Sequence, residues 1–560
     1  MKKNFINSFF KIKTYQHKTS LYVVCFSILL CLILIYPNTL LSQNNNINIK
    51  KLFTEANTNI RFKNYSTALN SLLKINAVDS TNANINYLIG ICYLNSHFNK
   101  SNAINYLIKS LKNTSVNYKE NNYKETNAPI NAYFHLAKAY HVNYQFDKAL
   151  EYYNTYKSLI PTQDSLIKKN LEYDILLSKN GLEIVKETLQ LFIENIGSQI
   201  NSNFDEHTPV LTADESTMIF TSRRKGSTGN LLDNDGRFFE DIYISEKKDG
   251  KWQEPENIGE PINTPGHEAS IGLSADGQEL FIYRDDFGDG NIYVSKRDSN
   301  KWTKPVKLST NINSTANETH ASVSADGTTL YFVSDRKGGF GGKDIYFSKR
   351  LPNGEWSLAK NIGDKINTPY DEEGTFIHPD GFTLYFSSKG HNSMGGYDLF
   401  YSELQNDETW SKAKNMGYPI NTTEDDVFYV LSADGKRAYY SCYKENGLGG
   451  KDIYRMNLLS LPERSLAVIT GVVRKKSSDI VPKDIEITVT DSESGVKIGS
   501  YKPNKQTGRY TLILLQNKEY IISCEAKGCV FNNEIIKIPN NSSFYEINKP
   551  IELDPIVTVE

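Results

Sequence analysis

The stretch that decides the fold reads Ser324-Ala-Asp326-Gly327-Thr-Thr-Leu-Tyr-Phe-Val-Ser334 and continues, after three residues, as Gly338-Gly-Phe-Gly-Gly-Lys-Asp344-Ile-Tyr346. Its turn aspartate occurs five times, at spacings of 62, 50, 54 and 54, and an upstream Ile-Asn pair repeats with the same spacings. Two markers that repeat in step indicate a duplicated unit, and periods near fifty are typical of propeller blades. The aspartates are Asp214, Asp276, Asp326, Asp380 and Asp434, and the asparagines are Asn201, Asn263, Asn313, Asn367 and Asn421.

Each repeat has the composition of short antiparallel strands. Residues 330–333 and 344–347 are rich in aromatic and β-branched residues, and Gly-rich breaks separate them. A strand containing tryptophan is expected after each Asp-Ile-Tyr strand, but the fifth repeat has no tryptophan at this place. Residues 188–197, ahead of the first repeat, have the right phase to supply the missing strand and close the ring. The prediction for residues 188–460 is therefore a β-propeller with five four-stranded blades.

The two flanking regions have different periods. Residues 47–182 alternate small and aromatic positions at twelve-residue intervals, as in Ala56 to Ala68 and Ala137 to Ala149, which is typical of tetratricopeptide-like helical repeats. Residues 465–556 contain short alternating strands separated by turn signals, which predicts a β-sandwich. The fold class is thus multidomain, with an α-helical solenoid, a five-bladed propeller and a C-terminal β-sandwich.

The N-terminus indicates the location of the protein in the cell. Lysines precede an apolar run at residues 21–36, and a polar Asn-rich stretch follows, so residues 1–42 are expected to be a signal peptide rather than a retained anchor. Cys31 lies in the middle of the apolar run, which argues against a lipid anchor.

Lys and Arg total 63 against 65 Asp and Glu, so no basic excess favours nucleic acid. Cys524 and Cys529 are close enough to form a disulfide, although buried free thiols are equally consistent with the sequence.

The order of modules and their motifs resemble the PorE family of Bacteroidetes. The resemblance rests on the Ser-x-Asp-Gly and Gly-Gly-x-Asp-Ile-Tyr blade motifs, the helical repeats, and a tail whose segments 470–473, 507–510 and 526–528 look like a carboxypeptidase regulatory-like domain. It implies an exported component at the periplasmic face of the outer membrane, with partners in type IX secretion or gliding. Family members usually continue into an OmpA-like domain that binds peptidoglycan. This sequence stops at residue 560, where that domain would begin, so direct peptidoglycan binding is not expected.

The repeats also place an acidic residue at one shared position, eight residues before each turn aspartate. This position opens the first and innermost strand of each blade. One interpretation is structural: each carboxylate accepts backbone N–H bonds or pairs with a cation such as Arg224 or Arg336. The other is a ring of negative charge at one channel mouth that binds a cationic partner segment. The five residues are Glu206, Glu268, Glu318, Glu372 and Asp426.

Catalytic patterns are scarce in the sequence. There is no Gly-x-Ser-x-Gly nucleophile motif. The sequence 233–236, Asp-Asn-Asp-Gly, could hold Ca²⁺, but an EF-hand pattern is not completed and an ordinary polar turn is the simpler interpretation. We therefore expect a non-catalytic scaffold for envelope proteins, without cofactors and with at most peripheral membrane association. The alternative is a periplasmic propeller enzyme, a lyase or hydrolase acting on glycan or peptide.

Overall fold

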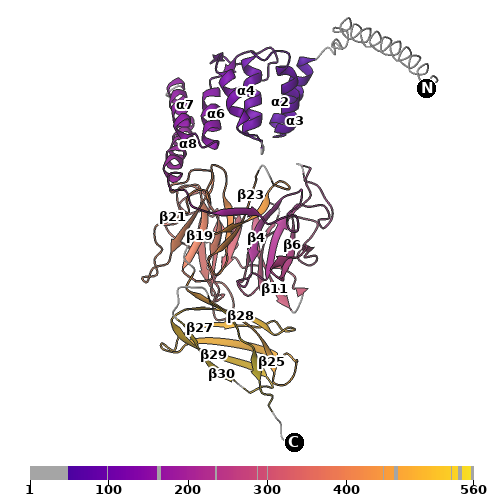
Figure 1. Cartoon of the computed structure of the whole chain (residues 1–560), viewed down its shortest axis with the longest axis vertical. Coiled ribbons are helices and arrows are strands. Elements are labelled where there is room, and N and C mark those ends of the chain that lie inside the picture. The colour runs from indigo at the N-terminus through magenta and orange to yellow at the C-terminus, as the bar shows by residue number, and fades with distance from the viewer. Residues whose placement is uncertain are drawn as a thin grey trace, which may run out of the picture.

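The computed structural model describes residues 48–556, apart from 97–98, 161–164, 234–235, 287, 299–300, 445–446, 459–463, 531 and 540–544. The expected signal peptide at residues 1–42 lies outside the described residues, as does part of the turn at 233–236. The described chain is multidomain and mostly β. Helices lie at one end, a ring of sheets in the middle and a β-sandwich at the other end (Figure 1).

Seven helices make up the N-terminal part of the described chain, and each packs against the next. Small residues allow this close packing. Ala56 and Ala68 are fully buried in one hydrophobic cluster, and a Cβ on Gly90 would stand 2.5 Å from Cγ of Leu107. A two-stranded parallel pair, β1 (Thr114–Ser115) and β2 (Ala128–Pro129), interrupts the series. The helices are α2 (Ile49–Arg61), α3 (Tyr65–Asn76), α4 (Ala83–Leu94), α5 (Asn102–Ser110), α6 (Ala132–Val142), α7 (Phe146–Leu159) and α8 (Ser165–Ile184).

Five antiparallel sheets follow, one for each copy of the repeat, and in each of them the first three strands pair in chain order. The first sheet contains β4 (Glu206–Leu211), β5 (Thr217–Ser222), β6 (Asp241–Lys248), β7 (Lys251–Trp252) and β8 (Glu256–Asn257). The second contains β9 (Glu268–Leu273), β10 (Glu279–Asp285), β11 (Gly290–Asp298), β12 (Lys301–Trp302) and β13 (Val306–Lys307). The third contains β14 (Glu318–Val323), β15 (Thr329–Ser334), β16 (Asp344–Lys349) and β17 (Lys360–Asn361), and the fourth contains β18 (Glu372–Ile377), β19 (Thr383–Ser388), β20 (Asp398–Glu403) and β21 (Lys414–Asn415).

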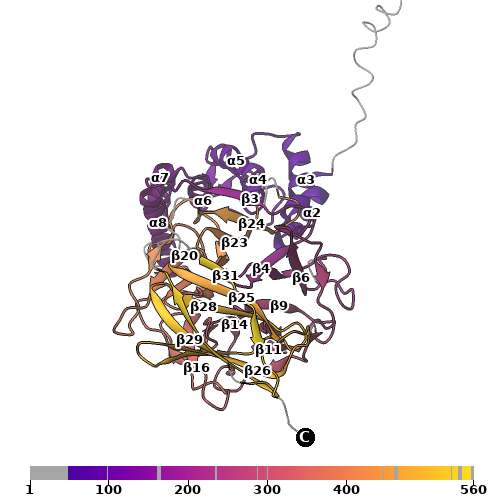
Figure 2. The ribbon, with the colours of Figure 1, turned by 60° about the horizontal axis from the view of Figure 1, so that its bottom comes forward.

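The fifth sheet joins two distant segments of the chain. It contains β22 (Val427–Leu431), β23 (Arg437–Cys442), β24 (Asp452–Asn457) and β3 (Phe192–Asn195). Tyr454 pairs with Asn195 and Asn457 with Phe192, so the expected closure by residues 188–197 is confirmed. The first strands contact one another in the order β4, β9, β14, β18, β22 and back to β4. This closed cycle is the arrangement of a β-propeller, and Figure 2 shows the ring obliquely from the sandwich side.

Two of the four tryptophans lie in the strand that the sequence predicted, Trp252 in β7 and Trp302 in β12, and the other two do not. Trp356 and Trp410 make only isolated bridges, with Arg350 and Leu404 at the end of the third strand. The outer strand begins four residues later, at Lys360 in the third sheet. Trp356 is buried in the hydrophobic core between sheets. The indole of Trp356 therefore packs between sheets, and the hydrogen bonds of the outermost strand are made by Lys360 and Asn361.

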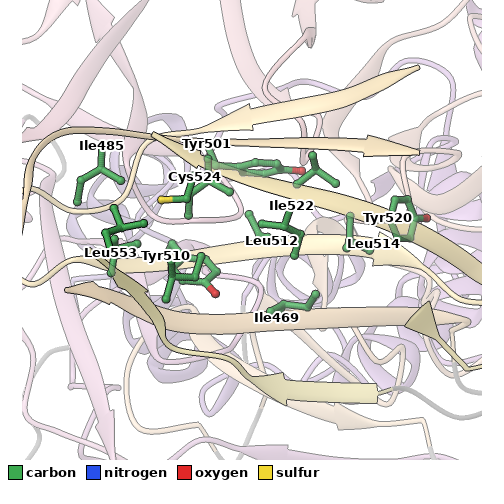
Figure 3. Close-up of a cluster of buried hydrophobic side chains, with 14 of the residues drawn as sticks. Ile469, Ile485, Tyr501, Tyr510, Leu512, Leu514, Tyr520, Ile522, Cys524 and Leu553 are labelled. Carbon is green, nitrogen blue, oxygen red and sulfur yellow. The ribbon is translucent and has the colours of Figure 1, made fainter. Parts of the chain in front are cut away.

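The sandwich pairs two sheets across one apolar core (Figure 3). Cys524 and Cys529 are buried in it as free thiols, so of the two alternatives the free state holds. One sheet has the order β28-β25-β31 with β32 beside β25, and the other has the order β27-β26-β29-β30. The strands are β25 (Leu466–Lys475), β26 (Lys483–Asp491), β27 (Lys497–Tyr501), β28 (Arg509–Leu515), β29 (Lys518–Lys527), β30 (Asn532–Ile538), β31 (Tyr545–Asn548) and β32 (Ile551–Leu553).

The sandwich covers one mouth of the ring channel. Leu466 and Val468 of β25 are buried in the same cluster as Ala213 and Ala433. These alanines are the variable residue of the Ser-x-Asp-Gly turn, and Ala275 and Ala325 of two other turns pack against the same cluster. A cavity of only about 30 Å³ is left among the turns. The small residue in the motif thus lets the sandwich approach the ring.

The channel is also filled near its middle. His320 of the third sheet stacks on Phe428 of the fifth, with ring centroids 5.3 Å apart. Gly374 of the fourth sheet lies beside them, and a Cβ there would stand 3.2 Å from the backbone nitrogen of Phe428. The positive φ of Gly374, 59°, is a conformation that glycine adopts without strain. The ring is therefore a packed core rather than an open pore.

Candidate functional site

The five acidic positions are buried and hydrogen-bonded within the ring. Their exposed fractions are 0–2%. Glu318 accepts bonds from the backbone N–H and the hydroxyl of Ser314, from the hydroxyl of Ser334 at 2.7 Å, and from Arg336 at 3.0 Å. The same pattern holds at Glu206, whose cation is Arg224. Because the two positions have the same kinds of partner, these contacts agree with the interpretation in which the carboxylates stabilise the ring.

Two of the five positions have no such arginine. Glu372 keeps the bonds from Thr368 and Ser388, but Gly390 stands where Arg336 stands in the third sheet. Burial raises the pKa of Glu372 to about 8. Burial and the nearby Asp398 carboxyl also raise the pKa of Asp426 well above its usual range. Near neutral pH these two groups contribute less negative charge than their residue types suggest.

Asp426 is the one of the five that lines the cavity described below, and there it accepts bonds from Thr422. The proposed function does not rest on these carboxylates. Their role in binding a cationic segment stays a prediction.

The sequence analysis missed the residue that directly precedes each acidic position. Asp371 accepts a bond from the backbone N–H of Lys343 in the preceding sheet, and Asp425 accepts one from Tyr397. The other three positions receive an N–H bond from the preceding sheet in the same way, and they are Asp205, His267 and Asn317. The signal was present as the Gly-Gly pair, because a Cβ on Gly342 would stand 2.3 Å from Asp371 Oδ1.

The Ile-Asn marker has an equally direct role. Asn367 accepts a bond from the backbone N–H of Ile345 and donates to the carbonyl oxygen of the same residue. Asn201, Asn263, Asn313 and Asn421 form the same two bonds, each with the third strand of the sheet that precedes it around the ring. Both markers that revealed the repeat are therefore structural.

The helices contact the ring through separate polar bonds and ring stacks. His141 Nε2 lies 2.9 Å from the carbonyl oxygen of Met394, and Asn180 donates to the carbonyl oxygen of Ser393 at 2.8 Å. The Tyr173 ring stacks on Tyr370 at 4.8 Å. Burial lowers the pKa of His141 to about 4, so this imidazole is neutral at neutral pH.

These contacts surround the candidate site, a cavity of about 920 Å³ between the helices and the ring, which we call the junction cavity. Its helical wall includes Lys138, His141 and Asp174. Its ring wall includes residues from β3, from the fourth and fifth sheets and from their loops. Five lysines and six tyrosines line it: Lys100, Lys138, Lys389, Lys444, Lys451, Tyr144, Tyr153, Tyr173, Tyr418, Tyr440 and Tyr443. A cavity of this size, with apolar faces and a few charged groups, has the character of a ligand site.

The described residues offer little for metal or membrane chemistry. Over that part of the chain, no group of three or more His, Cys, Asp or Glu side chains is arranged to hold a metal ion. None of the helices within it is long and apolar enough to cross a membrane. Cys442 lines the junction cavity, but burial raises the pKa of its thiol to about 12, so it is protonated at neutral pH.

No protein-family model and no curated protein sequence matches the chain. Among solved structures the ring is similar to TolB from Acinetobacter baumannii, at 15% identity and a TM-score of 0.29, over 45% of this chain and 54% of that one. It is also similar to a putative TolB from Agrobacterium tumefaciens, at 17% identity and a TM-score of 0.26, over 48% and 96%. A third is CoXyl43, a GH43 β-xylosidase/α-arabinofuranosidase from a compost microbial metagenome, at 11% identity and a TM-score of 0.34, over 55% and 96%.

The chain thus spans about half the length of the first of these structures. Likeness at such TM-scores carries no argument about activity. The pairing of strands and the closed cycle of sheets define the propeller independently.

Proposed function

We propose that the protein is a non-catalytic scaffold that binds protein partners in the bacterial envelope. Its three modules would be a tetratricopeptide-like repeat array, a five-bladed propeller and a carboxypeptidase regulatory-like sandwich. The observation that carries the proposal is the junction cavity, which is formed jointly by the helices and the ring and is lined by charged and aromatic side chains. Repeat helices commonly bind extended peptides on their inner surface.

The organisation of the ring supports this proposal. Its repeated polar residues are bonded to other parts of the ring, as at Glu318 and Asn367, and they provide no asymmetric set of catalytic groups. The sandwich covers one channel mouth and the helices lie over the other side, so the ring stands between two modules. The resemblance to the PorE family gives the expected setting, the periplasmic face of the outer membrane, with type IX secretion or gliding proteins as partners.

The test is crosslinking of the tagged full chain in its native envelope, followed by mass spectrometry of the captured proteins. The proposal expects a reproducible set of partners, with crosslinks concentrated on the helices and the ring face next to them. A parallel assay offers the purified chain a panel of glycans and peptides. Turnover that one or two point substitutions abolish, without any stable partner, would replace the scaffold by the enzyme alternative.

A further inference from the structure

We propose that the junction cavity binds an acidic segment of a partner protein. This inference rests on the proposed scaffold function and specifies where the partner binds and by what chemistry.

Three of the five lysines at the cavity have no carboxylate partner among the described residues. Lys138 lies on α6, Lys444 follows β23 and Lys451 precedes β24. The other two are paired, Lys100 with Glu424 and Lys389 with Asp371. Asp174, Glu424, Asp425 and Asp426 also line the cavity, so its lysines outnumber its carboxyl groups by five to four. Burial raises the pKa of Asp426 well above its usual range, which increases the positive excess at neutral pH. Low-dielectric walls increase the attraction of such a cluster for an anion.

The free lysines stand on walls that belong to different modules. Lys138 is contributed by the helices, whereas Lys444 and Lys451 are contributed by the fifth sheet of the ring. A single small anion would meet one wall at a time, but an extended chain with several carboxylates can meet both. Such a ligand would also bridge the helices and the ring.

Tyrosines supply the remaining contact area. Tyr144 on the helical side and Tyr418 on the ring side pack edge to face with centroids 5.4 Å apart. The ammonium group of Lys444 lies 4.6 Å from the centroid of the Tyr454 ring. Tyrosine buries a large apolar area and keeps a polar hydroxyl, which is why it is enriched where proteins bind proteins.

Asp174 on α8 favours a peptide over a uniformly anionic polymer such as an acidic polysaccharide. Its carboxyl lines the cavity, and the positive charge that acts on it is that of Lys138 on α6, although the two side chains make no ion-pair contact. Burial raises the pKa of Asp174 to about 6, so it is mainly charged at neutral pH. A polymer with a carboxylate on every unit would be repelled by it. A peptide can place a backbone N–H there and its own carboxylates at the lysines.

The test uses the purified full chain and a fluorescent peptide rich in Asp and Glu, with the Asn and Gln version as the uncharged comparison. Fluorescence anisotropy is measured at about 50 and 300 mM salt, since added salt screens charge attraction. The acidic peptide is expected to bind, and to bind more weakly at the higher salt concentration. Combined Lys138→Ala, Lys444→Ala and Lys451→Ala substitutions should weaken it by about tenfold or more.

The matched control removes three exposed lysines of the sandwich that have no ion pair either, by Lys483→Ala, Lys497→Ala and Lys537→Ala. This control should change the affinity by less than about twofold. Melting curves establish that both variants are folded. If the cavity variant does not fold, a photoreactive acidic peptide on the unmodified chain replaces it, and crosslinks to α6 and to residues 440–451 are expected.

Three results would overturn the proposal: equal binding of the uncharged peptide, equal loss in the control variant, or crosslinks elsewhere. Binding of polygalacturonate without binding of the peptide would assign the cavity to a glycan and also overturn it. Envelope crosslinking separates this inference from the scaffold function. Partners that are captured equally well by the cavity variant would leave the scaffold in place and remove only the acidic-segment site.

Discussion

The two sides of the ring are joined to their neighbouring modules by different kinds of interface. On the sandwich side, Leu466 and Val468 share a continuous apolar cluster with turn alanines. On the helix side, individual contacts such as that of His141 with Met394 surround a cavity of about 920 Å³. A continuous apolar interface is a permanent attachment because opening it exposes apolar surface. An interface of separate polar contacts around a cavity leaves room for a ligand.

A charge placed in the sandwich interface should disrupt it strongly. We expect Val468→Asp to destabilise the protein by about 4 kcal/mol or more, because an unpaired carboxylate would be buried among apolar side chains. Val496→Asp, at a site that is 59% exposed on the same module, is the control and should cost less than about 0.5 kcal/mol. Urea unfolding measures both. Equal midpoints for the two variants would show that the sandwich side is not a continuous core.

Glu318 and Glu372 occupy equivalent positions in two neighbouring sheets of the ring, but only Glu318 has an arginine beside it. Their glutamine variants can therefore be compared. Glu318→Gln should destabilise by about 2–3 kcal/mol, because it removes the buried charge that pairs with Arg336. Glu372→Gln should cost less than about 1 kcal/mol at pH 7, since a carboxyl with a pKa of about 8 is already mostly protonated there.

The effect of Glu372→Gln on stability should depend on pH, and the direction of this dependence follows from the pKa of Glu372. The folded-state pKa of Glu372 is raised from 4.5 to about 8, so this residue costs stability progressively as pH rises through that window. Relative to the unmodified chain, Glu372→Gln should therefore gain stability between pH 5 and 8, as followed by thermal melting. A constant difference across that range would contradict the buried, unpaired state of Glu372.

The combined Glu268→Gln, Glu318→Gln and Glu372→Gln variant tests the partner-binding role of the acidic positions. If the variant folds and captures every envelope partner at low salt, the positions are structural. If it folds and loses partners, they take part in binding.

Acid is expected to weaken the interface between the helices and the ring. The pKa of His141 falls from 6.5 in the unfolded chain to about 4 in the folded one, so its contribution to stability is present above pH 6.5 and is lost as pH falls toward 4. After correction for the slower intrinsic exchange in acid, the protection factors of α6 and α8 should be lower at pH 5 than at pH 7, whereas those of β25 in the sandwich stay unchanged. Asn180→Ala removes a bond to Ser393 but no titratable group, and should weaken the same interface by about 1 kcal/mol at both pH values. Uniform protection of α6 and α8 at both pH values would contradict the prediction.

The smallest expected effect sharpens the role of the junction cavity. Asp174→Asn should raise stability at pH 7.5 by about 1 kcal/mol and leave it unchanged near pH 4. The reason is that the folded-state pKa is raised from 3.8 to about 6, so the charged form costs stability above that window. Thermal melting at the two pH values measures the difference. A loss of stability at pH 7.5 would indicate that Asp174 has a partner within the protein.

Much of the ring could be predicted from the sequence because each marker is a local pattern with a fixed role. The closing strand could be predicted because residues 188–197 have the same phase as the outer strands of the other sheets. The structure shows the equivalence directly: Asn195 donates to Asp452, just as Asn361 donates to Asp344 in the third sheet. The replacement of glycine by Glu215 in the first copy could not be interpreted in this way. It accepts bonds from Arg437 and Tyr439 of the fifth sheet, more than 200 positions away in the chain.

The junction cavity was unpredictable for a related reason. It is formed by the way in which α6 and α8 lie on the loops of the fourth sheet, and no local period encodes that docking. The acidic positions were found, but their burial depends on partners such as Ser334, which lies sixteen residues later on the next strand. The sequence could supply the charge but not its degree of burial.

The closing strand also has a mechanical consequence. The chain passes from α8 into β3 at Phe192 and leaves β24 at Asn457, and these two residues face each other at one end of the same ladder. Tension between the helices and the sandwich would therefore load the ladder from that end, one pair of bonds at a time, as in opening a zipper, rather than across all its bonds in shear. The attachments of both modules to the ring would carry that load before it reached the ladder. A chain pulled at its helices and its sandwich would yield first at its module interfaces and keep its ring closed.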